Sequence, residues 1–246
     1  ASERPETVMT EMKTFVFKQV RFIYTDELDG GASYHANLFV PVLKKIGRGF
    51  SKCMEMFSGV GITGLSLVLE GICDRVDLVD INPKCKDYAL YNIKAASLES
   101  RARFIISDLF KDVSDNDYDL IIGNPPRVPD PSRVEPSKRL KAVDVDYNIH
   151  KEFLRHLSEH LSPRGFALLL EDYINLPLGR LREIANNFKN YRYEIVKPSF
   201  LDSFRAASIA FLGRGVSLAS PKTALLMISE AARWRKHFYF IKIEII

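Results

Sequence analysis

Five short apolar runs are the feature that most restricts the fold of this chain. They alternate with longer amphipathic segments, which is typical of strands separated by helices. Strands that are apolar almost throughout are typical of a parallel sheet with helices on both faces. The pattern therefore predicts an α/β fold with a doubly wound, mostly parallel sheet. The runs are CMEMF (53–57), VDLVDI (76–81), RFIISD (103–108), YDLIIG (118–123) and FALLLED (166–172).

Two further segments bring the predicted sheet to seven strands. After a helix at about 177–189, the segments 193–200 and 208–213 are expected to form an antiparallel pair at the sheet edge. The last part of the chain predicts one more helix and one more strand, and in an alternative arrangement the terminal strand 237–246 closes the sheet. Residues 14–24 alternate apolar and polar side chains, which favours an N-terminal strand or hairpin.

The length of 246 residues, with 46% hydrophobic and 27% charged residues, suits one domain. We divide it into an N-terminal hairpin and helix (1–49), an α/β core (50–215) and a C-terminal helix-strand extension (216–246). The three cysteines have no CxxC spacing, so neither a disulfide framework nor a thiolate metal site is expected. No window of 18 apolar residues and no signal-peptide pattern occur, so we expect a soluble, cytoplasmic protein without a membrane partner.

Charge alone does not identify a partner. The net charge of +4 is compatible with an acidic partner but does not require one. The basic-aromatic cluster at 233–237 is suited either to a phosphate backbone or to the polar end of a helix. The proline-rich, charged loop 127–141 is suited either to covering a substrate or to a solvated surface. The pattern H-x-x-E-H at 156–160 lacks a third ligand, and no metal site is expected there.

A glycine-rich turn, EMFSGVGITG (55–64), follows the first core strand. Such a turn lets a ligand approach the backbone closely, although tight turns also need glycine for conformational reasons alone. Asp80 ends the second strand, 21 positions after Gly59, where a carboxylate can accept both hydroxyls of a ribose. This arrangement suits either a nicotinamide dinucleotide or S-adenosylmethionine.

Two carboxylates favour the second of these ligands. Glu55 stands where a dinucleotide would place a pyrophosphate, and a carboxylate suits the cationic amino group of a methionine instead. Ser107 and Asp108 end the third strand, in position to meet an adenine amino group.

The order of these motifs resembles that of the class I, Rossmann-like, S-adenosylmethionine-dependent methyltransferases over about residues 50–215. IIGNPPR (121–127) resembles their Asn-Pro-Pro-aromatic signature, found in enzymes that methylate amino groups of adenine or guanine or the side-chain amide of glutamine. Gly31, Ser33 and Tyr34 lie in a segment that often lines the pocket in this family. The resemblance assigns Glu55, Phe57, Ser58, Gly59, Gly61, Asp80, Ile81, Asp108, Leu109 and Asn124 to the cofactor, Asn124 and Pro125 to catalysis, and Pro126, Arg127 and Tyr34 to the substrate.

The Asn-Pro-Pro motif implies a chemistry. A planar amino or amide nitrogen is a poor nucleophile because its lone pair is delocalised. If the side-chain oxygen of Asn124 and the carbonyl of Pro125 each accept one N–H, the lone pair is directed at the methyl group and the developing positive charge is stabilised. The prolines end the strand and stiffen this geometry.

The residue after the second proline departs from the family pattern. The family has an aromatic ring there that stacks on a flat target, whereas this chain has Arg127. A guanidinium can also stack on a planar group or pair with a phosphate or carboxylate. Three functions therefore remain open: an N-methyltransferase acting on RNA, DNA or protein, which the resemblance favours; a small-molecule or peptide tailoring methyltransferase; and an NAD(P)-dependent oxidoreductase.

Overall fold

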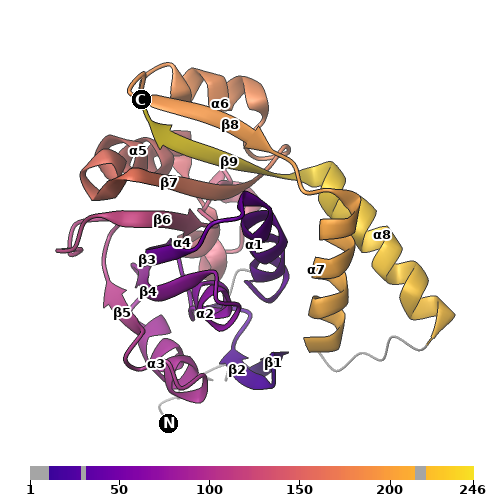
Figure 1. The fold of residues 1–246 in the computed structure, drawn as a ribbon. Coiled ribbons are helices and arrows are strands. Elements are labelled where there is room, and N and C mark those ends of the chain that lie inside the picture. Colours follow the sequence, from indigo (N-terminus) through magenta and orange to yellow (C-terminus); the bar gives the residue numbers. More distant parts are fainter. Residues whose placement is uncertain (1–10, 29–31, 214–219) are drawn as a thin grey trace, which may run out of the picture.

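The structure, a computed structural model, describes residues 11–28, 32–213 and 220–246. Seven of the described strands form one sheet in the order β5-β4-β3-β6-β7-β9-β8 (Figure 1). Only β9 runs antiparallel to its neighbours, β7 and β8. This confirms the predicted fold class. The strands are β3 (Phe50–Met56), β4 (Cys73–Asp80), β5 (Ala102–Ile106), β6 (Tyr118–Gly123), β7 (Leu161–Asp172), β8 (Tyr191–Val196) and β9 (Phe238–Ile245).

Helices bury both faces of the sheet. Successive side chains of the central strands alternate between two apolar clusters: Cys53 and Leu120 belong to one, Met54 and Ile121 to the other. Because both faces are covered, the strands are apolar almost throughout, as the sequence pattern indicated. The first cluster includes side chains of α1 (Ala32–Ile46), α2 (Ile62–Leu69) and α3 (Cys85–Ala95), and the second those of α5 (Asn148–His160) and α6 (Leu178–Ala185).

The N-terminal segment forms a separate two-stranded hairpin, as predicted, from β1 (Lys13–Phe17) and β2 (Val20–Tyr24). The two turn residues between the strands have φ values of 45° and 68°, as a two-residue hairpin turn requires. Asn92, a fully buried residue of α3, holds the hairpin against the core. Its Oδ1 accepts the N–H of Ile23 at 2.8 Å, and its Nδ2 donates to the carbonyl of Ile23 at 3.0 Å.

The predicted second strand of the antiparallel edge pair is wrong. Residues 208–213 lie in α7 (Phe200–Gly213), and the strand paired with β8 is the C-terminal β9. The alternative arrangement placed this terminal strand in the sheet, but β9 lies between β7 and β8, and β8 forms the edge. The apolar run failed as a strand because Ala206, Ala207 and Ala210 recur at helical spacing and form a fully buried helix face, and α7 packs against α1. The predicted C-terminal helix is α8 (Pro221–His237).

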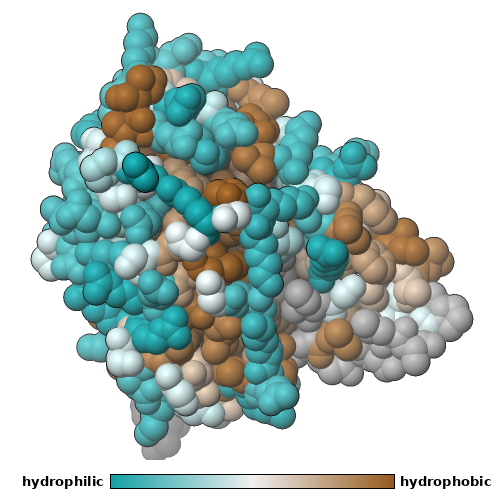
Figure 2. Space-filling model, in the orientation of Figure 1, coloured by the Kyte–Doolittle hydropathy of each residue, from teal (hydrophilic) through white to brown (hydrophobic). Residues whose placement is uncertain are grey.

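Helices α7 and α8 pack together and project from the body of the sheet (Figure 1). Hydrophobic side chains are visible on this part of the surface in Figure 2. Leu225, Leu226 and Ile228 of α8 are exposed. Within the ranges that the structure describes, no helix combines the length and apolar character needed to cross a bilayer.

Candidate active site

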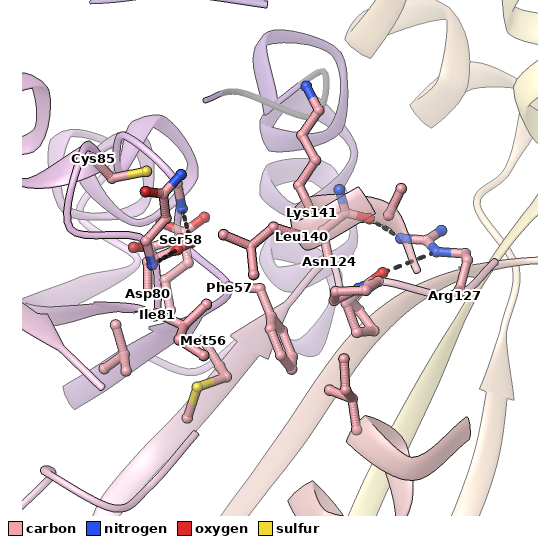
Figure 3. Close-up of a pocket in the computed structure, with 18 of the residues that line it drawn as sticks. Met56, Phe57, Ser58, Asp80, Ile81, Cys85, Asn124, Arg127, Leu140 and Lys141 are labelled. Atoms are coloured by element: carbon pink, nitrogen blue, oxygen red, sulfur yellow. Dashed lines mark hydrogen bonds between the residues drawn. The ribbon is translucent and has the colours of Figure 1, made fainter. Parts of the chain in front are cut away.

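The carboxyl ends of the parallel strands border a cavity of about 380 Å³ (Figure 3). Ligand sites of open α/β sheets lie at this edge. We call the part at the tips of β3, β4 and β5 the β4 end, and the part at the tips of β6 and β7 the β6 end. The lining of the β4 end includes Glu55, Ser58, Gly59, Asp80, Ile81, Asp108 and Leu109, and that of the β6 end includes Asn124, Pro125, Pro126, Arg127, Val128, Ile149, Asp172, Asn175 and Phe238. Phe57 lies between the two ends in Figure 3.

The cavity thus brings together the predicted site residues, with two exceptions. Gly61, at φ 82°, precedes α2 and is not part of the lining; a Cβ there would lie 2.4 Å from Leu78 Cδ1, so this glycine makes room for the core. Tyr34 lies in α1, but its side chain, like Gly31 and the side chain of Ser33, lies outside the described residues.

Asp80 ties the end of β4 to the glycine turn. Its Oδ2 accepts the N–H of Gly59 at 2.7 Å and its Oδ1 accepts the N–H of Asn82 at 2.8 Å. Burial raises the pKa of the carboxyl, and these two N–H donors oppose that shift. At Gly59, with φ 52°, a Cβ would lie 2.9 Å from the carbonyl oxygen of Leu28. Only glycine at this position therefore lets the turn approach both the Asp80 carboxylate and the carbonyl of Leu28.

Two further carboxylates end the neighbouring strands. Glu55 is buried in β3, and its Oε2 accepts the N–H of Gly64 at 2.7 Å, near the start of α2. Asp108 follows β5, is about half exposed, and pairs with Lys111. The hydroxyl of Ser107 shapes this second turn, since it donates to the carbonyl of Leu109 at 2.8 Å.

Ser58 is the polar group of the β4 end whose bonding is incomplete. Its side chain is 2% exposed and lines the cavity, and its Oγ has no hydrogen-bond partner among the described residues. A buried hydroxyl without a partner is costly, because its hydration is lost and not replaced. The Oγ atom is therefore a ready contact for a polar ligand in the cavity.

At the β6 end, one cation lies on the two oxygens of the Asn-Pro-Pro motif. Arg127 is 8% exposed, donates from Nη2 to Asn124 Oδ1, and donates from Nε to the carbonyl oxygen of Pro125 at 3.2 Å (Figure 3). Its Nε is also 3.6 Å from Glu171 Oε2, and its Nη1 is 3.7 Å from Asp172 Oδ2. The guanidinium thus lies between two carbonyl oxygens and two carboxylates of this chain.

Behind Arg127 is a buried chain of ionisable groups. Glu171 is fully buried, its Oε1 is 3.1 Å from His150 Nε2, and His150 Nδ1 is 2.5 Å from Asp144 Oδ2. Burial by itself would lower the pKa of His150, but the carboxylates of Glu171 and Asp144 outweigh burial and raise its pKa to about 9. The imidazole is therefore a cation at neutral pH.

Our sequence reasoning missed this cluster. Glu171 and Asp172 end a predicted strand, FALLLED, and the rule that ligands lie at the carboxyl ends of parallel strands would have identified Asp172. No comparable signal marks Asp144 or His150. Asp144 precedes α5 and His150 lies in its first turn, and both reach the cluster only through the packing of this segment on the sheet.

The loop after the motif lines part of the cavity with Leu140, Lys141 and Ala142. Lys141 donates from Nζ to the carbonyl of Asp26. The backbone N–H groups of Arg127 and Val128 both donate to the carbonyl of Ala142, at 3.0 and 2.8 Å, which closes the base of the loop.

Two other patterns from the sequence lie away from the cavity. In the cluster 233–237, Trp234 is buried in the core and Arg233 pairs with Glu230 of the same helix. In the pattern 156–160, Nε2 of His156 lies 3.1 Å from Oε1 of Glu152, and the ring of His160 stacks on the ring of Phe110. Among the described residues, no group of three or more His, Cys, Asp or Glu side chains is arranged to hold a metal ion.

Comparison with known proteins finds methyltransferases both by sequence and by structure. Residues 23–199, more than half of the chain, match the family described as methyltransferase small domain. The chain is 34% identical over 143 residues to the ribosomal protein uL3 glutamine methyltransferase of Bradyrhizobium diazoefficiens, covering 55% of this chain and 43% of that protein. It is 27% identical over 148 residues to the release factor glutamine methyltransferase of Shewanella oneidensis, covering 57% of this chain and 51% of that protein. The chain therefore spans about half the length of these relatives.

Solved structures share the fold at low sequence identity. The ribosomal protein L11 methylase of Lactobacillus delbrueckii superposes with a TM-score of 0.53 at 13% identity, over 88% of this chain and 80% of that one. M. jannaschii TYW2, solved in complex with AdoMet, gives a TM-score of 0.50 at 17% identity, over 96% and 87%. None of these comparisons supports the oxidoreductase alternative, which we abandon.

Proposed function

The chain belongs to the methyltransferase small domain family, and from this premise we propose that it uses S-adenosylmethionine to methylate the carboxamide nitrogen of a glutamine in a protein. The observation that carries the proposal is the position of the Asn124 and Pro125 oxygens, which lie in the same cavity as Asp80 and Ser58. A binding region for a nucleoside and one for a nitrogen with two N–H groups therefore lie next to each other in one cavity.

The β4 end fits the cofactor. The Oγ of Ser58 is buried and has no hydrogen-bond partner in the part of the chain that the structure describes, and the turn at Gly59 leaves no room for a Cβ. The Asp80 carboxylate accepts two backbone N–H groups, but a carboxylate has about four acceptor positions, so two remain for the hydroxyls of a ribose. Glu55, which accepts the N–H of Gly64, lines the same end and places a carboxylate there that suits an ammonium group.

The β6 end supplies what an amide nitrogen needs. The cofactor contributes a methyl group on a sulfonium. The oxygens of Asn124 and Pro125 accept the two N–H groups of the amide, orient its nitrogen, and stabilise the positive charge that develops there. One N–C bond forms as one S–C bond breaks, S-adenosylhomocysteine leaves, and the nitrogen releases one proton to solvent.

Two observations support glutamine over a purine base. The position after Pro126, where the resembling family has a stacking ring, holds a buried arginine turned towards the carboxylates of this chain. The relatives over this region are named as glutamine methyltransferases of a ribosomal protein and of a release factor.

The proposal is tested by the destination of the methyl group. The chain is incubated with methyl-labelled S-adenosylmethionine and, in parallel, with ribosomal protein uL3, a release factor, or total RNA. We expect label in protein, with N-methylglutamine identified by mass spectrometry, and no label after replacement of that glutamine by alanine. Label in RNA or in small molecules, or no transfer despite cofactor binding, would contradict the proposal.

A further inference from the structure

The guanidinium of Arg127 is hydrogen-bonded to the two oxygens that would accept the N–H groups of the target nitrogen in the proposed reaction. This group is planar and presents N–H groups to Asn124 Oδ1 and to the carbonyl of Pro125. A carboxamide also is planar and presents two N–H groups. Arg127 therefore occupies the space that the acceptor amide needs, and the two groups cannot bind these oxygens in the same way at the same time.

A second place for the guanidinium exists close by. Glu171 Oε2 is buried, has no hydrogen-bond partner among the described residues, and is 3.6 Å from Arg127 Nε. Asp172 Oδ2 is 3.7 Å from Nη1. Hydrogen bonds between guanidinium and carboxylate are about 2.7–2.9 Å long, so both carboxylates lie only about 1 Å beyond hydrogen-bond distance of the guanidinium.

The carboxylates of this second place are fixed. His150 holds Oε1 of Glu171 at 3.1 Å, and Asp144 holds His150 in turn. Asp172 Oδ1 accepts the N–H groups of Ile174 and Asn175 at 3.0 and 2.8 Å. The orphan oxygen of Glu171 is therefore held in place by its surroundings, facing Arg127.

The geometry points to Arg127 as a positioning residue whose guanidinium has two binding positions, which we call stations. This inference rests on the proposed function. Without acceptor, the guanidinium satisfies the oxygens of Asn124 and Pro125. When an amide binds, its two N–H groups replace the guanidinium, which moves onto Glu171 and Asp172. Only a group with two N–H donors replaces both hydrogen bonds, so Arg127 selects primary amides against carboxylates and hydroxyls, which would leave one or both oxygens unpaired.

The first test is a double-mutant cycle on the acceptor KM. Glu171→Gln weakens the second station, so Arg127 stays on Asn124 and Pro125, and the KM should rise about tenfold, the loss of one charge-assisted hydrogen bond. In the Arg127→Met background no guanidinium has to move, and Glu171→Gln should then change the KM less than about twofold. An equal effect of Glu171→Gln in both backgrounds would overturn the inference. Arg103→Met, at another arginine paired with two carboxylates, controls for the loss of a cation.

The second test does not need turnover. With S-adenosylhomocysteine bound, the Nε–H resonance of Arg127, assigned by its loss in Arg127→Lys, is followed by ¹⁵N NMR during titration with acetylglutamine methylamide. We expect a shift with this amide and none with acetylglutamate methylamide, an isostere without the NH₂ group. An unmoved resonance when the amide is bound would overturn the inference.

The two proposals fail separately. Methylation of glutamine without movement of the Arg127 resonance contradicts the two-station inference alone. Movement with the amide but no methylation of glutamine contradicts the proposed function alone. If the amide neither moves the resonance nor is methylated, both are wrong.

Discussion

The two ends of the cavity are built differently. At the β4 end, the fixed contacts join a side chain to a backbone N–H close by in the chain or the sheet, as between Asp80 and Gly59 or Glu55 and Gly64. At the β6 end, ionisable side chains from separate segments meet inside the protein, as Arg127, His150 and Glu171 do. The contacts of the β4 end depend mainly on the path of the backbone. Those of the β6 end depend on the identity of every side chain in the cluster.

This difference has a physical consequence. Removing one member of a buried charged cluster leaves its partners charged and unpaired, which is costly. A backbone turn is instead sensitive to an added Cβ where its glycine has positive φ and a close neighbour.

The largest effect is expected for Asn124→Ala at the β6 end. In the proposed reaction its side-chain oxygen is one of two acceptors for the target nitrogen, and removal of one such group costs about 10²–10³ in kcat. The dissociation constant of S-adenosylmethionine, measured by titration calorimetry, should stay within about threefold, since the β4 end is unchanged. Full activity of this variant would show that the tip of β6 has only a structural role.

The next effect concerns the charge on His150. Its pKa is raised to about 9 in the folded protein from 6.5, so protonation stabilises the fold. This stabilisation is fully present below pH 6.5 and is lost as the pH rises through about 9, by an amount on the order of 3 kcal/mol.

Denaturant unfolding at several pH values between 6 and 9.5 measures this loss. His150→Gln removes the titrating group, so the free energy of unfolding of this variant should be nearly independent of pH in the same window. A slope that persists in His150→Gln would show that other groups cause it and that the β6 end does not depend on this cation.

The same difference explains what the sequence could predict. The β4 end follows from local patterns: a glycine turn after one strand and a carboxylate at the end of the next. These patterns predicted that Gly59 and Asp80 would lie together, because adjacent parallel strands end at one edge, and the family resemblance added Ser58. The seven-stranded sheet was predictable for a similar reason, since its central strands are apolar almost throughout.

The charged cluster of the β6 end was not predictable in this way. The cluster of Asp144, His150 and Glu171 forms only because α5 packs on the sheet. Helical periodicity does not indicate which polar residue near the start of a helix faces the protein interior. The misplaced edge strand has a related cause. A short apolar run such as 208–213 fits a strand and a buried helix equally, and its packing on α1 decides between them.

A smaller effect is expected for a side chain that supports the β4 end from outside the cavity. Asn92 Nδ2 donates to the carbonyl of Val60 in the glycine turn at 3.0 Å, besides its two bonds to Ile23. Asn92→Ala leaves these buried groups without partners and should lower the free energy of unfolding by about 2 kcal/mol in urea titrations. Asn187→Ala, at an exposed residue with one hydrogen bond, should change it by less than about 0.5 kcal/mol. Equal losses would remove Asn92 as a support of the turn.

The smallest effect tests the backbone construction of the β4 end by adding one methyl group. Gly59 and Gly71 both have positive φ, 52° and 68°, so alanine strains the backbone at either position, by about 1 kcal/mol. They differ in surroundings: a Cβ at Gly59 meets Leu28 O at 2.9 Å beside the cavity, whereas a Cβ at Gly71 has nothing within 4 Å. Gly59→Ala should therefore weaken S-adenosylmethionine binding about tenfold in calorimetric titrations, because the turn shifts away from Asp80, and Gly71→Ala should leave it unchanged. If both variants bind the cofactor as the unaltered chain does, the path of the turn does not determine the β4 end, and the contrast between the two ends fails.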